Sequence, residues 1–177
     1  MRDDPDHFTL LGLPAKFALD RTRLDAAWRE AQAQVHPDRF AVGSPAERRV
    51  AMQWASRVNE AYRVLRSPLE RARYLCERAG QDLQVETNTA MAPGFLMQQM
   101  EWREALDDAR ASRQMAPLDA LADDLAATRK QLSEDIAVLL DEAGDHAAAS
   151  ARVREWMFIE KFSDEIDTAR DRLADSH

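Results

Sequence analysis

Cysteine and glycine are scarce in this sequence, and long apolar runs are missing from it. Cys76 is the only cysteine in 177 residues, so no internal disulfide bond can form and a reducing, cytosolic compartment is expected. No run of 18 apolar residues is present, which argues against a membrane-spanning helix. The first residues, Met1-Arg2-Asp3-Asp4, are polar and acidic, so we expect no secretory signal peptide. We therefore expect a cytoplasmic protein with no membrane partner.

The composition is that of a helix-rich globular protein whose charge is unevenly distributed. Hydrophobic residues make up 45% of the chain and charged residues 32%, with only five glycines. Residues 1–79 carry 14 basic and 11 acidic side chains, a net charge of +3, whereas residues 80–177 carry 10 and 21, a net charge of −11. The change of sign suggests two domains with different partners. A weakly basic first half and a strongly acidic second half argue against nucleic acid as a ligand.

Helix-start and helix-stop signals divide the first 80 residues into helices. The segment 7–13 is short and apolar, Asp20 can cap the helix that follows it, and the apolar period of that helix must end before Pro37. Ser44-Pro45-Ala46-Glu47 is a capping box with proline at the first helical position, and Ser67-Pro68 starts another helix that Gly80 ends. Apolar side chains in the long helix between them follow the period of one helix face, predicted to face the core: Val50, Trp54, Val58 (or Ala55), Ala61 and Leu65.

The remaining residues predict a linker followed by a helical bundle. Residues 81–92 lack helical periodicity for most of their length and are assigned to the linker. Three long helices are expected, from Pro93 to Ser112, from Pro117 to a stop at Gly144, and from His146 to Leu173. Because no stretch shows sustained strand alternation, we predict an all-α fold in which residues 93–177 form an antiparallel three-helix bundle. All four tryptophans fall on stripes predicted to face the core: Trp28, Trp54, Trp102 and Trp156.

The tripeptide His36-Pro37-Asp38 forms a stiff corner between two amphipathic helices. Proline fixes its own φ and disfavours helix at the residue before it, so the corner presents an imidazole and a carboxylate in a rigid loop. In this setting residues 6–79 resemble the J-domain family, with Asn59-Glu60-Ala61-Tyr62-Arg63 as a further match, and residues 1–80 are assigned to such a domain. The resemblance implies an antiparallel helical hairpin with short flanking helices that binds a DnaK/HscA-type ATPase chaperone and stimulates its ATP hydrolysis. The chaperone-binding residues it implies are His36, Pro37, Asp38, Arg39 and Arg29.

The helix that starts at Pro93 carries two apolar stripes, where a surface helix normally needs one. Phe95, Trp102 and Leu106 share the face predicted to lie inside the bundle, together with Gln99, Ala109 and Arg113. Leu96, Met97 and Met100 point the other way, among charged residues. A second apolar stripe flanked by charges is typical of an interaction surface, to which methionine is suited by its flexibility. The alternative is that Leu96 and Met97 pack beneath the linker or against the first domain.

The whole chain then resembles the HscB-type iron–sulfur co-chaperones. The resemblance is carried by Phe95-Leu96-Met97-Gln98-Gln99-Met100-Glu101-Trp102-Arg103-Glu104, by Phe8-Thr9-Leu10-Leu11-Gly12-Leu13-Pro14 and by Arg71-Ala72-Arg73-Tyr74-Leu75. It implies a co-chaperone, itself not an enzyme and without a cofactor, whose bundle delivers an IscU-type iron–sulfur scaffold to the ATPase chaperone. The scaffold-binding residues it implies are Leu96, Met97, Met100, Glu101, Arg103, Glu104 and Phe158.

Other interpretations of these motifs are less favoured. The second stripe could make the bundle a dimerisation or regulatory module for another client, although we expect a monomer. A hydrolytic His36–Asp38 pair is disfavoured because no nucleophile pattern accompanies it. Cys76 is predicted to be a small buried side chain, and no metal site is proposed because the scattered histidines and acidic runs lack ligand spacing.

Overall fold

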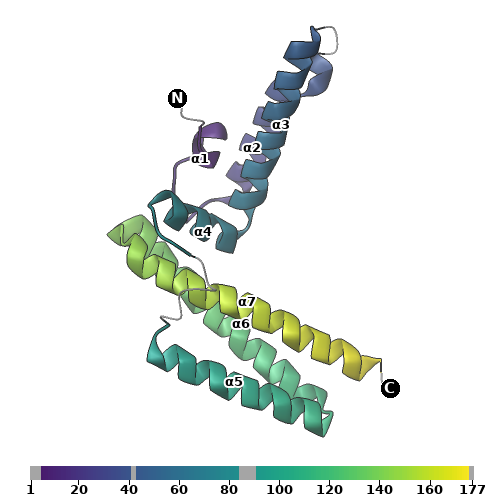
Figure 1. Ribbon diagram of the computed structural model, residues 1–177, viewed down its shortest axis with the longest axis vertical. Helices are drawn as coiled ribbons and strands as arrows, with labels where there is room; N and C mark the ends of the chain where they lie inside the picture. Colours follow the sequence, from purple (N-terminus) through teal and green to yellow (C-terminus); the bar gives the residue numbers. More distant parts are fainter. Residues whose placement is uncertain (1–4, 41–42, 84–90, 176–177) are drawn as a thin grey trace. The chain divides into compact units, whose positions relative to one another are not determined.

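The computed structural model describes residues 5–40, 43–83 and 91–175, and it is helical throughout that part of the chain (Figure 1). This confirms the predicted all-α fold. The chain divides into two compact units, Met1–Arg78 and Ala79–His177, called here the N-terminal unit and the C-terminal unit. No helix in the described segments is long and apolar enough to cross a membrane.

The N-terminal unit is built on a hairpin of two helices. In order, its elements are α1 (His7–Leu10), α2 (Arg21–Val35), the 3₁₀ turn η1 (Pro37–Phe40), α3 (Pro45–Arg66) and α4 (Pro68–Arg78). The predicted caps are present: the Asp20 carboxylate accepts from the backbone N–H of Arg23, and Ser44 and Glu47 form a reciprocal capping box. α2 and α3 lie side by side with α1 against them (Figure 1).

The core of the N-terminal unit lies where the hairpin meets α1 and α4. Its fully buried apolar side chains include Phe8, Leu24, Val58, Ala61, Leu65 and Ala72. Cys76 is buried as predicted. Val50, however, is exposed, and Trp28 and Trp54 are only half-buried, so the prediction that they belong to the core is wrong for Val50 and incomplete for the two tryptophans. Periodicity identifies one face of a helix, but it does not show how far along the helix that face is covered.

The C-terminal unit is a three-helix bundle of α5 (Pro93–Ser112), α6 (Met115–Ala137) and α7 (His146–Ala174), with a π-helical segment η2 (Val138–Ala143) closing α6. Gly144, with φ of 64°, ends that segment as predicted. α6 begins at Met115, not at Pro117, so proline occupies its third position. The predicted linker lies partly outside the described residues, but Leu83 within it is buried in this unit and the carbonyl of Asp82 accepts from Arg154 Nη1 at 3.4 Å.

One stripe from each helix forms the core of the bundle. Trp102, Leu106 and Ala109 of α5 are buried. The buried apolar side chains of the other two helices include Leu118, Leu121, Leu125, Leu132 and Ile136 of α6 and Val153, Trp156, Ile159, Phe162 and Ile166 of α7. Trp102 also donates from Nε1 to an Asp124 oxygen of α6 at 2.6 Å. This bond holds α5 in the rotation that places its second stripe outside the bundle.

Candidate interaction sites

The His36-Pro37-Asp38 corner ends α2 and turns the chain toward α3. His36 is the C-cap of α2 with extended backbone angles, φ −60° and ψ 129°, as expected for a residue before proline. The turn η1 follows at once and is closed by a bond from the N–H of Arg39 to the carbonyl of His36 at 3.0 Å. The corner is therefore short, hydrogen-bonded and continuous with a long helix.

The polar side chains of this corner face solvent. The Asp38 side chain is 89% exposed, and its backbone N–H donates to Nδ1 of His36 at 3.3 Å. Nδ1 of His36 also lies 3.5 Å from an Asp38 carboxylate oxygen, so the two polar side chains of the corner are neighbours. The exposed Asp38 carboxylate can accept charge-assisted hydrogen bonds from a partner's arginine.

Two of the predicted contact residues carry positive charge near this corner. Arg39 is held in place by a bond from its Nη1 to the carbonyl of Ala33 at 3.1 Å, in the last turn of α2. Arg29 is exposed on α2, one to two turns before the corner. Arg21, by contrast, pairs with Asp25 at 2.8 Å and also donates to Tyr62, so it is engaged within the hairpin.

An apolar groove that the sequence interpretation did not anticipate lies between the end of α2 and the start of α3. It has a volume of about 290 Å³ and is lined chiefly by Val35, Val50, Ala51 and Trp54. The guanidinium of Arg57 lies 4.9 Å from the centre of the Trp54 ring. The groove leaves the apolar side chain of Val50 exposed, although Val50 was predicted to lie in the core. The apolar spacing of the sequence does not predict this exposure.

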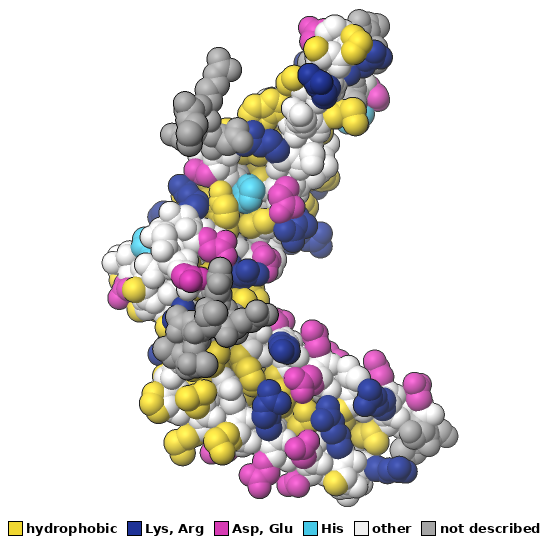
Figure 2. Space-filling view, in the orientation of Figure 1, with side chains coloured by type: hydrophobic (Ala, Val, Ile, Leu, Met, Phe, Trp, Pro, Cys, Tyr) yellow, Lys and Arg dark blue, Asp and Glu magenta, His cyan; other side chains and the backbone are white. Residues whose placement is uncertain are grey.

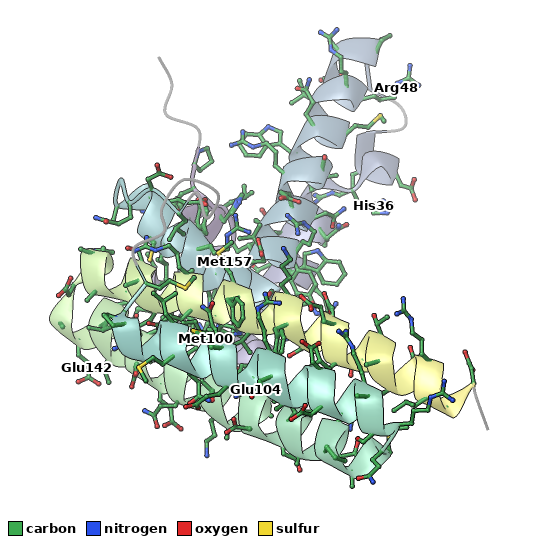
Figure 3. All side chains as sticks on the ribbon, turned by 60° about the horizontal axis from the view of Figure 1, so that its bottom comes forward. His36, Arg48, Met100, Glu104, Glu142 and Met157 are labelled. Atoms are coloured by element: carbon green, nitrogen blue, oxygen red, sulfur yellow. The ribbon has the colours of Figure 1, made fainter. Side chains whose placement is uncertain are left out.

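The second stripe of α5 is exposed, as its helical position predicts. Leu96, Met97 and Met100 are 43%, 65% and 71% exposed, and we call these three side chains the α5 patch. Exposed apolar side chains gather over the beginning of α5 in Figure 2, and Met100 is labelled on this helix in Figure 3. These residues leave apolar area in solvent on a helix that already buries Trp102 and Leu106.

Phe158 of α7 borders the α5 patch through a group of aromatic rings. Its ring centre lies 5.8 Å from that of Phe95 and 6.5 Å from that of Trp102, so Phe158 belongs to the seam between α5 and α7. Arg103 covers this seam: its guanidinium carbon lies 5.8 Å from the Phe158 ring centre, and its Nη1 lies 4.0 Å from a Glu165 oxygen. Phe158 and Phe95 are both half-buried, so Phe95, predicted as core, is partly accessible as well.

The two glutamates predicted at this site complete its charged border. Glu101 and Glu104 are exposed on α5, and Glu101 accepts from Gln98 Nε2 at 3.1 Å. Glu101 follows Met97 by four residues, and Glu104 follows Met100 by four, so each carboxylate shares a helix face with a methionine. The structure thus brings all seven predicted scaffold-binding residues to the beginning of α5 and the adjacent part of α7.

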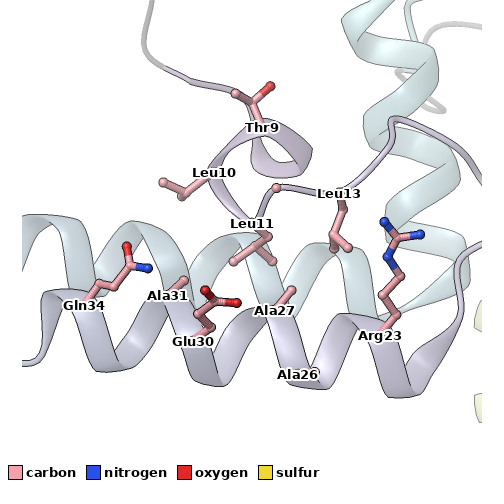
Figure 4. Close-up of a pocket in the computed structure, with 11 residues that line it drawn as sticks. Thr9, Leu10, Leu11, Leu13, Arg23, Ala26, Ala27, Glu30, Ala31 and Gln34 are labelled. Carbon is pink, nitrogen blue, oxygen red and sulfur yellow. The ribbon is translucent and has the colours of Figure 1, made fainter.

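A different cavity, of about 520 Å³, lies between the loop after α1 and the outer face of α2 (Figure 4). Its polar lining groups are Thr9, Arg23, Glu30 and Gln34, a set without a nucleophile paired to a base. Among the described residues, no group of three or more His, Cys, Asp or Glu side chains is placed to hold a metal ion.

Sequence comparison places this chain beside co-chaperones. A family model described as the HSCB C-terminal oligomerisation domain matches residues 91–167. The co-chaperone protein HscB homolog of Bordetella petrii is 61% identical over 166 residues, covering 93% of this chain and 96% of the relative. The homolog of Burkholderia cenocepacia is 54% identical over 167 residues, covering 94% and 95%.

Solved structures agree with the sequence relatives. Chaperone HscB from Vibrio cholerae superposes with a TM-score of 0.79 at 34% identity, covering 96% of this chain and 99% of that chain. The human co-chaperone protein HscB shares the fold, with a TM-score of 0.85 at 24% identity over 95% of this chain and 83% of that chain. With two differently charged helical units, an exposed corner on one, an apolar patch on the other and relatives this similar along nearly its whole length, the chain belongs to the HscB family of co-chaperones.

Proposed function

We propose that this co-chaperone acts in iron–sulfur cluster biogenesis by bringing an IscU-type scaffold to a DnaK/HscA-type ATPase chaperone and stimulating the ATPase. The N-terminal unit contacts the chaperone through His36, Pro37 and Asp38, with Arg39 and Arg29 as flanking cations. The C-terminal unit binds the scaffold through the α5 patch and its border of Glu101, Arg103, Glu104 and Phe158. The proposal is supported most directly by the α5 patch, which lies beside a complete core and therefore has no role in closing the bundle.

Two binding sites on one chain explain how such a protein acts without catalysing a reaction. A scaffold bound to the C-terminal unit is tethered to the unit that contacts the chaperone, which raises the local concentration of scaffold at the chaperone. The rigid corner loses little conformational entropy on binding. The methionines of the patch adapt to a partner's surface at low cost.

The chaperone contact is tested by Asp38→Asn. This change keeps the shape of the side chain and removes the charge that an arginine would bind, so stimulation of the chaperone's ATPase should be abolished while scaffold binding is unchanged. Glu77→Gln is the control: it removes the charge of an exposed carboxylate on α4, away from the corner, and should leave stimulation intact. ATPase rates measured with and without scaffold check both variants. Full stimulation by the Asp38→Asn protein would refute the role given to the corner.

The scaffold contact is tested by changing Leu96, Met97 and Met100 to serine. Each side chain that is a true hot spot should cost about 1–3 kcal/mol of binding free energy, while the melting temperature should stay nearly unchanged because these side chains are exposed. Met115→Ser is the matched control, since Met115 is an exposed apolar residue beyond the other end of α5, roughly 20 Å away along the helix. Calorimetric titration with scaffold and thermal unfolding give the two readouts. A collapse of stability with no selective loss of binding would mean that the stripe is part of the core.

Self-association of the bundle is a second candidate, because the matching family model is described as an oligomerisation domain. The α5 patch would then pair with the same patch of a second copy. Analytical ultracentrifugation separates the two functions: a mass that rises with concentration and falls in the triple serine variant supports self-association. A constant monomer mass supports scaffold binding.

A further inference from the structure

Two exposed methionine side chains lie in the proposed scaffold-binding surface. Six of the seven methionines lie in the described segments. Met97 and Met100 are 65% and 71% exposed, whereas Met91 and Met157, which lie in the same unit, are half-buried. Met157 and Met100 are labelled in Figure 3. Met91 is further engaged, since its Sδ accepts from Gln99 Nε2 at 3.0 Å.

We infer that Met97 and Met100 form a site of reversible oxidation by hydrogen peroxide, through which peroxide switches scaffold docking off. The predicted loss of scaffold binding rests on the proposed function, whereas the oxidation of Met97 and Met100 does not. A methionine sulfoxide is polar where the thioether was apolar, and sulfoxide reductases can reverse the change. A surface that uses methionine for apolar contact therefore loses that contact on oxidation and regains it on reduction.

The chemistry is a transfer of one oxygen atom. A lone pair of the thioether sulfur attacks the peroxide, an S–O bond forms and the O–O bond breaks. The departing hydroxide and the proton of the transferred oxygen leave as water. Sulfur is oxidised by two electrons and the peroxide is reduced by two, so the reaction needs no other reagent. It does need an approach to sulfur, which Met97 and Met100 allow.

Nearby charges favour oxidation of Met97 and Met100 over oxidation of Met52, a methionine of similar exposure on α3. Positive charge develops on sulfur as the S–O bond forms, and a carboxylate lies one helical turn away from each: Glu101 from Met97 and Glu104 from Met100. Arg103 follows Met100 by three residues, but its guanidinium lies over the Phe158 ring and 4.0 Å from a Glu165 oxygen, which partly balances its charge. Met52 on α3 is 63% exposed but lies four residues after Arg48, and Arg48 and Arg49 line the same surface hollow as its side chain. Positive neighbours disfavour a developing cation. Hydrogen peroxide is neutral, so these charges act on the reaction itself and not on delivery of the oxidant.

The test is oxidation of the full chain by dilute hydrogen peroxide at low ionic strength, with each methionine followed by peptide mass spectrometry. Met97 and Met100 should react faster than Met91 and Met157. They should also react about twofold to threefold faster than Met52, an advantage that 1 M salt should reduce. Equal rates for Met97, Met100 and Met52 at low salt would overturn the electrostatic part of the inference, and faster oxidation of Met91 would overturn the site.

The consequence is measured as affinity for the purified scaffold before and after oxidation. Oxidised protein should bind about tenfold or more weakly, and treatment with methionine sulfoxide reductases should restore binding. The double variant Met97→Leu and Met100→Leu removes both sulfurs, so its affinity for scaffold, compared before and after peroxide, should not change. Met52→Leu should remain as sensitive as the unmodified chain.

The outcomes separate the inference from the function on which it rests. Loss of binding in the double leucine variant after peroxide treatment would overturn the assignment to Met97 and Met100. Failure of the untreated chain to bind scaffold would instead refute the proposed function, and the docking consequence with it. The oxidation rates would still decide whether the site exists. Bound scaffold should also slow oxidation of Met97 and Met100 without protecting Met52, and equal protection of all three would contradict a docking surface at the α5 patch.

Discussion

At the scale of single residues, the most consequential side chain that is not at either interaction site is Arg71 of α4. It is only 8% exposed, and its Nε donates to the carbonyl of Phe17 at 2.7 Å while Nη1 donates to the carbonyl of Leu65. Its guanidinium carbon lies 5.2 Å from the centre of the Phe17 ring. One arginine thus satisfies two backbone carbonyls, one before α2 and one at the end of α3.

Arg71→Met should lower the free energy of unfolding of the N-terminal unit by about 2–4 kcal/mol. The methionine fills part of the volume but removes the two guanidinium hydrogen bonds that Arg71 makes to the carbonyls of Phe17 and Leu65 in a buried setting. Arg63→Met is the control, because Arg63 is exposed and pairs with Glu60 on the surface, an interaction worth less than about 1 kcal/mol. Urea unfolding of the three proteins gives the comparison. Similar losses for both variants would show that Arg71 contributes no more than a surface charge.

Sequence patterns predicted the exposure of residues better than their partners. The outward position of Met97 and Met100 follows from helical spacing alone, since a helix with Trp102 and Leu106 inside must turn its opposite face outward. The burial of Arg71 has no such signal, because an arginine in an amphipathic helix is normally placed in solvent. Its acceptors lie 54 and 6 residues away in the chain, and only the fold brings them together.

At the scale of helices and turns, start signals were more reliable than lengths. The capping box at Ser44 and the prolines at 68 and 93 mark the observed starts of α3, α4 and α5. The predicted start of α6 at Pro117 is two residues too late. The N–H groups of the first helical turn have no helical acceptor, so proline fits the third position as well as the first. The π-helical segment Val138–Ala143 was not predicted, since widening of the helical turn leaves no mark in apolar spacing.

The turn between α5 and α6 contains a strained residue that offers a test at this scale. Arg113 is the C-cap of α5 and has φ of 51°, in the left-handed region that glycine normally occupies after a helix. An L-residue in this conformation destabilises the folded state by roughly 1–2 kcal/mol, a cost that glycine avoids. Glycine also has more conformational freedom in the unfolded chain, which offsets part of this advantage.

Arg113→Gly should therefore raise the free energy of unfolding of the C-terminal unit by about 0.5–1 kcal/mol, an uncommon gain from adding glycine. Arg110→Gly, three residues earlier and inside α5, should lower it by about 1 kcal/mol, because glycine in a helix interior is unfavourable. Thermal unfolding of both variants checks the opposite signs. A loss of stability in Arg113→Gly would mean that the arginine side chain contributes more than its backbone costs.

At the scale of the whole molecule, the chain divides into two compact units that differ in charge. The N-terminal unit is weakly basic and presents a polar corner, whereas the C-terminal unit is strongly acidic and presents an apolar patch. The change in charge falls near the end of α4 in the sequence. Under the proposed function each unit carries one contact, so the Asp38 and α5 patch variants are expected to separate chaperone stimulation from scaffold binding.

Ionisable groups of the N-terminal unit make its stability depend on pH. Hydrogen bonds from Tyr62 and Arg21 lower the pKa of Asp25, the backbone N–H of Ser44 lowers that of Glu47, and Arg63 lowers that of Glu60. A carboxyl with a lowered pKa stabilises the fold above its ordinary value near 4 and loses that contribution as pH falls through the lowered value. These groups therefore favour the folded unit at neutral pH and cease to do so in acid.

His7 should extend this acid sensitivity to a milder range. Burial lowers the pKa of His7 from its ordinary 6.5, and its ring stacks on Tyr74 with centres 4.3 Å apart, so the folded unit favours the neutral imidazole. A histidine of this kind contributes its full stability above about pH 6.5, and the contribution shrinks as pH falls below that value. Hydrogen exchange of α3 amides, corrected for intrinsic rates, should therefore show declining protection from about pH 6.5 downward, with a further decline below about pH 4.5. His7→Gln should remove the first decline and keep the second, while His146→Gln in the C-terminal unit should leave both. Protection in α3 that stays flat from pH 7 to pH 5 would contradict the role given to His7.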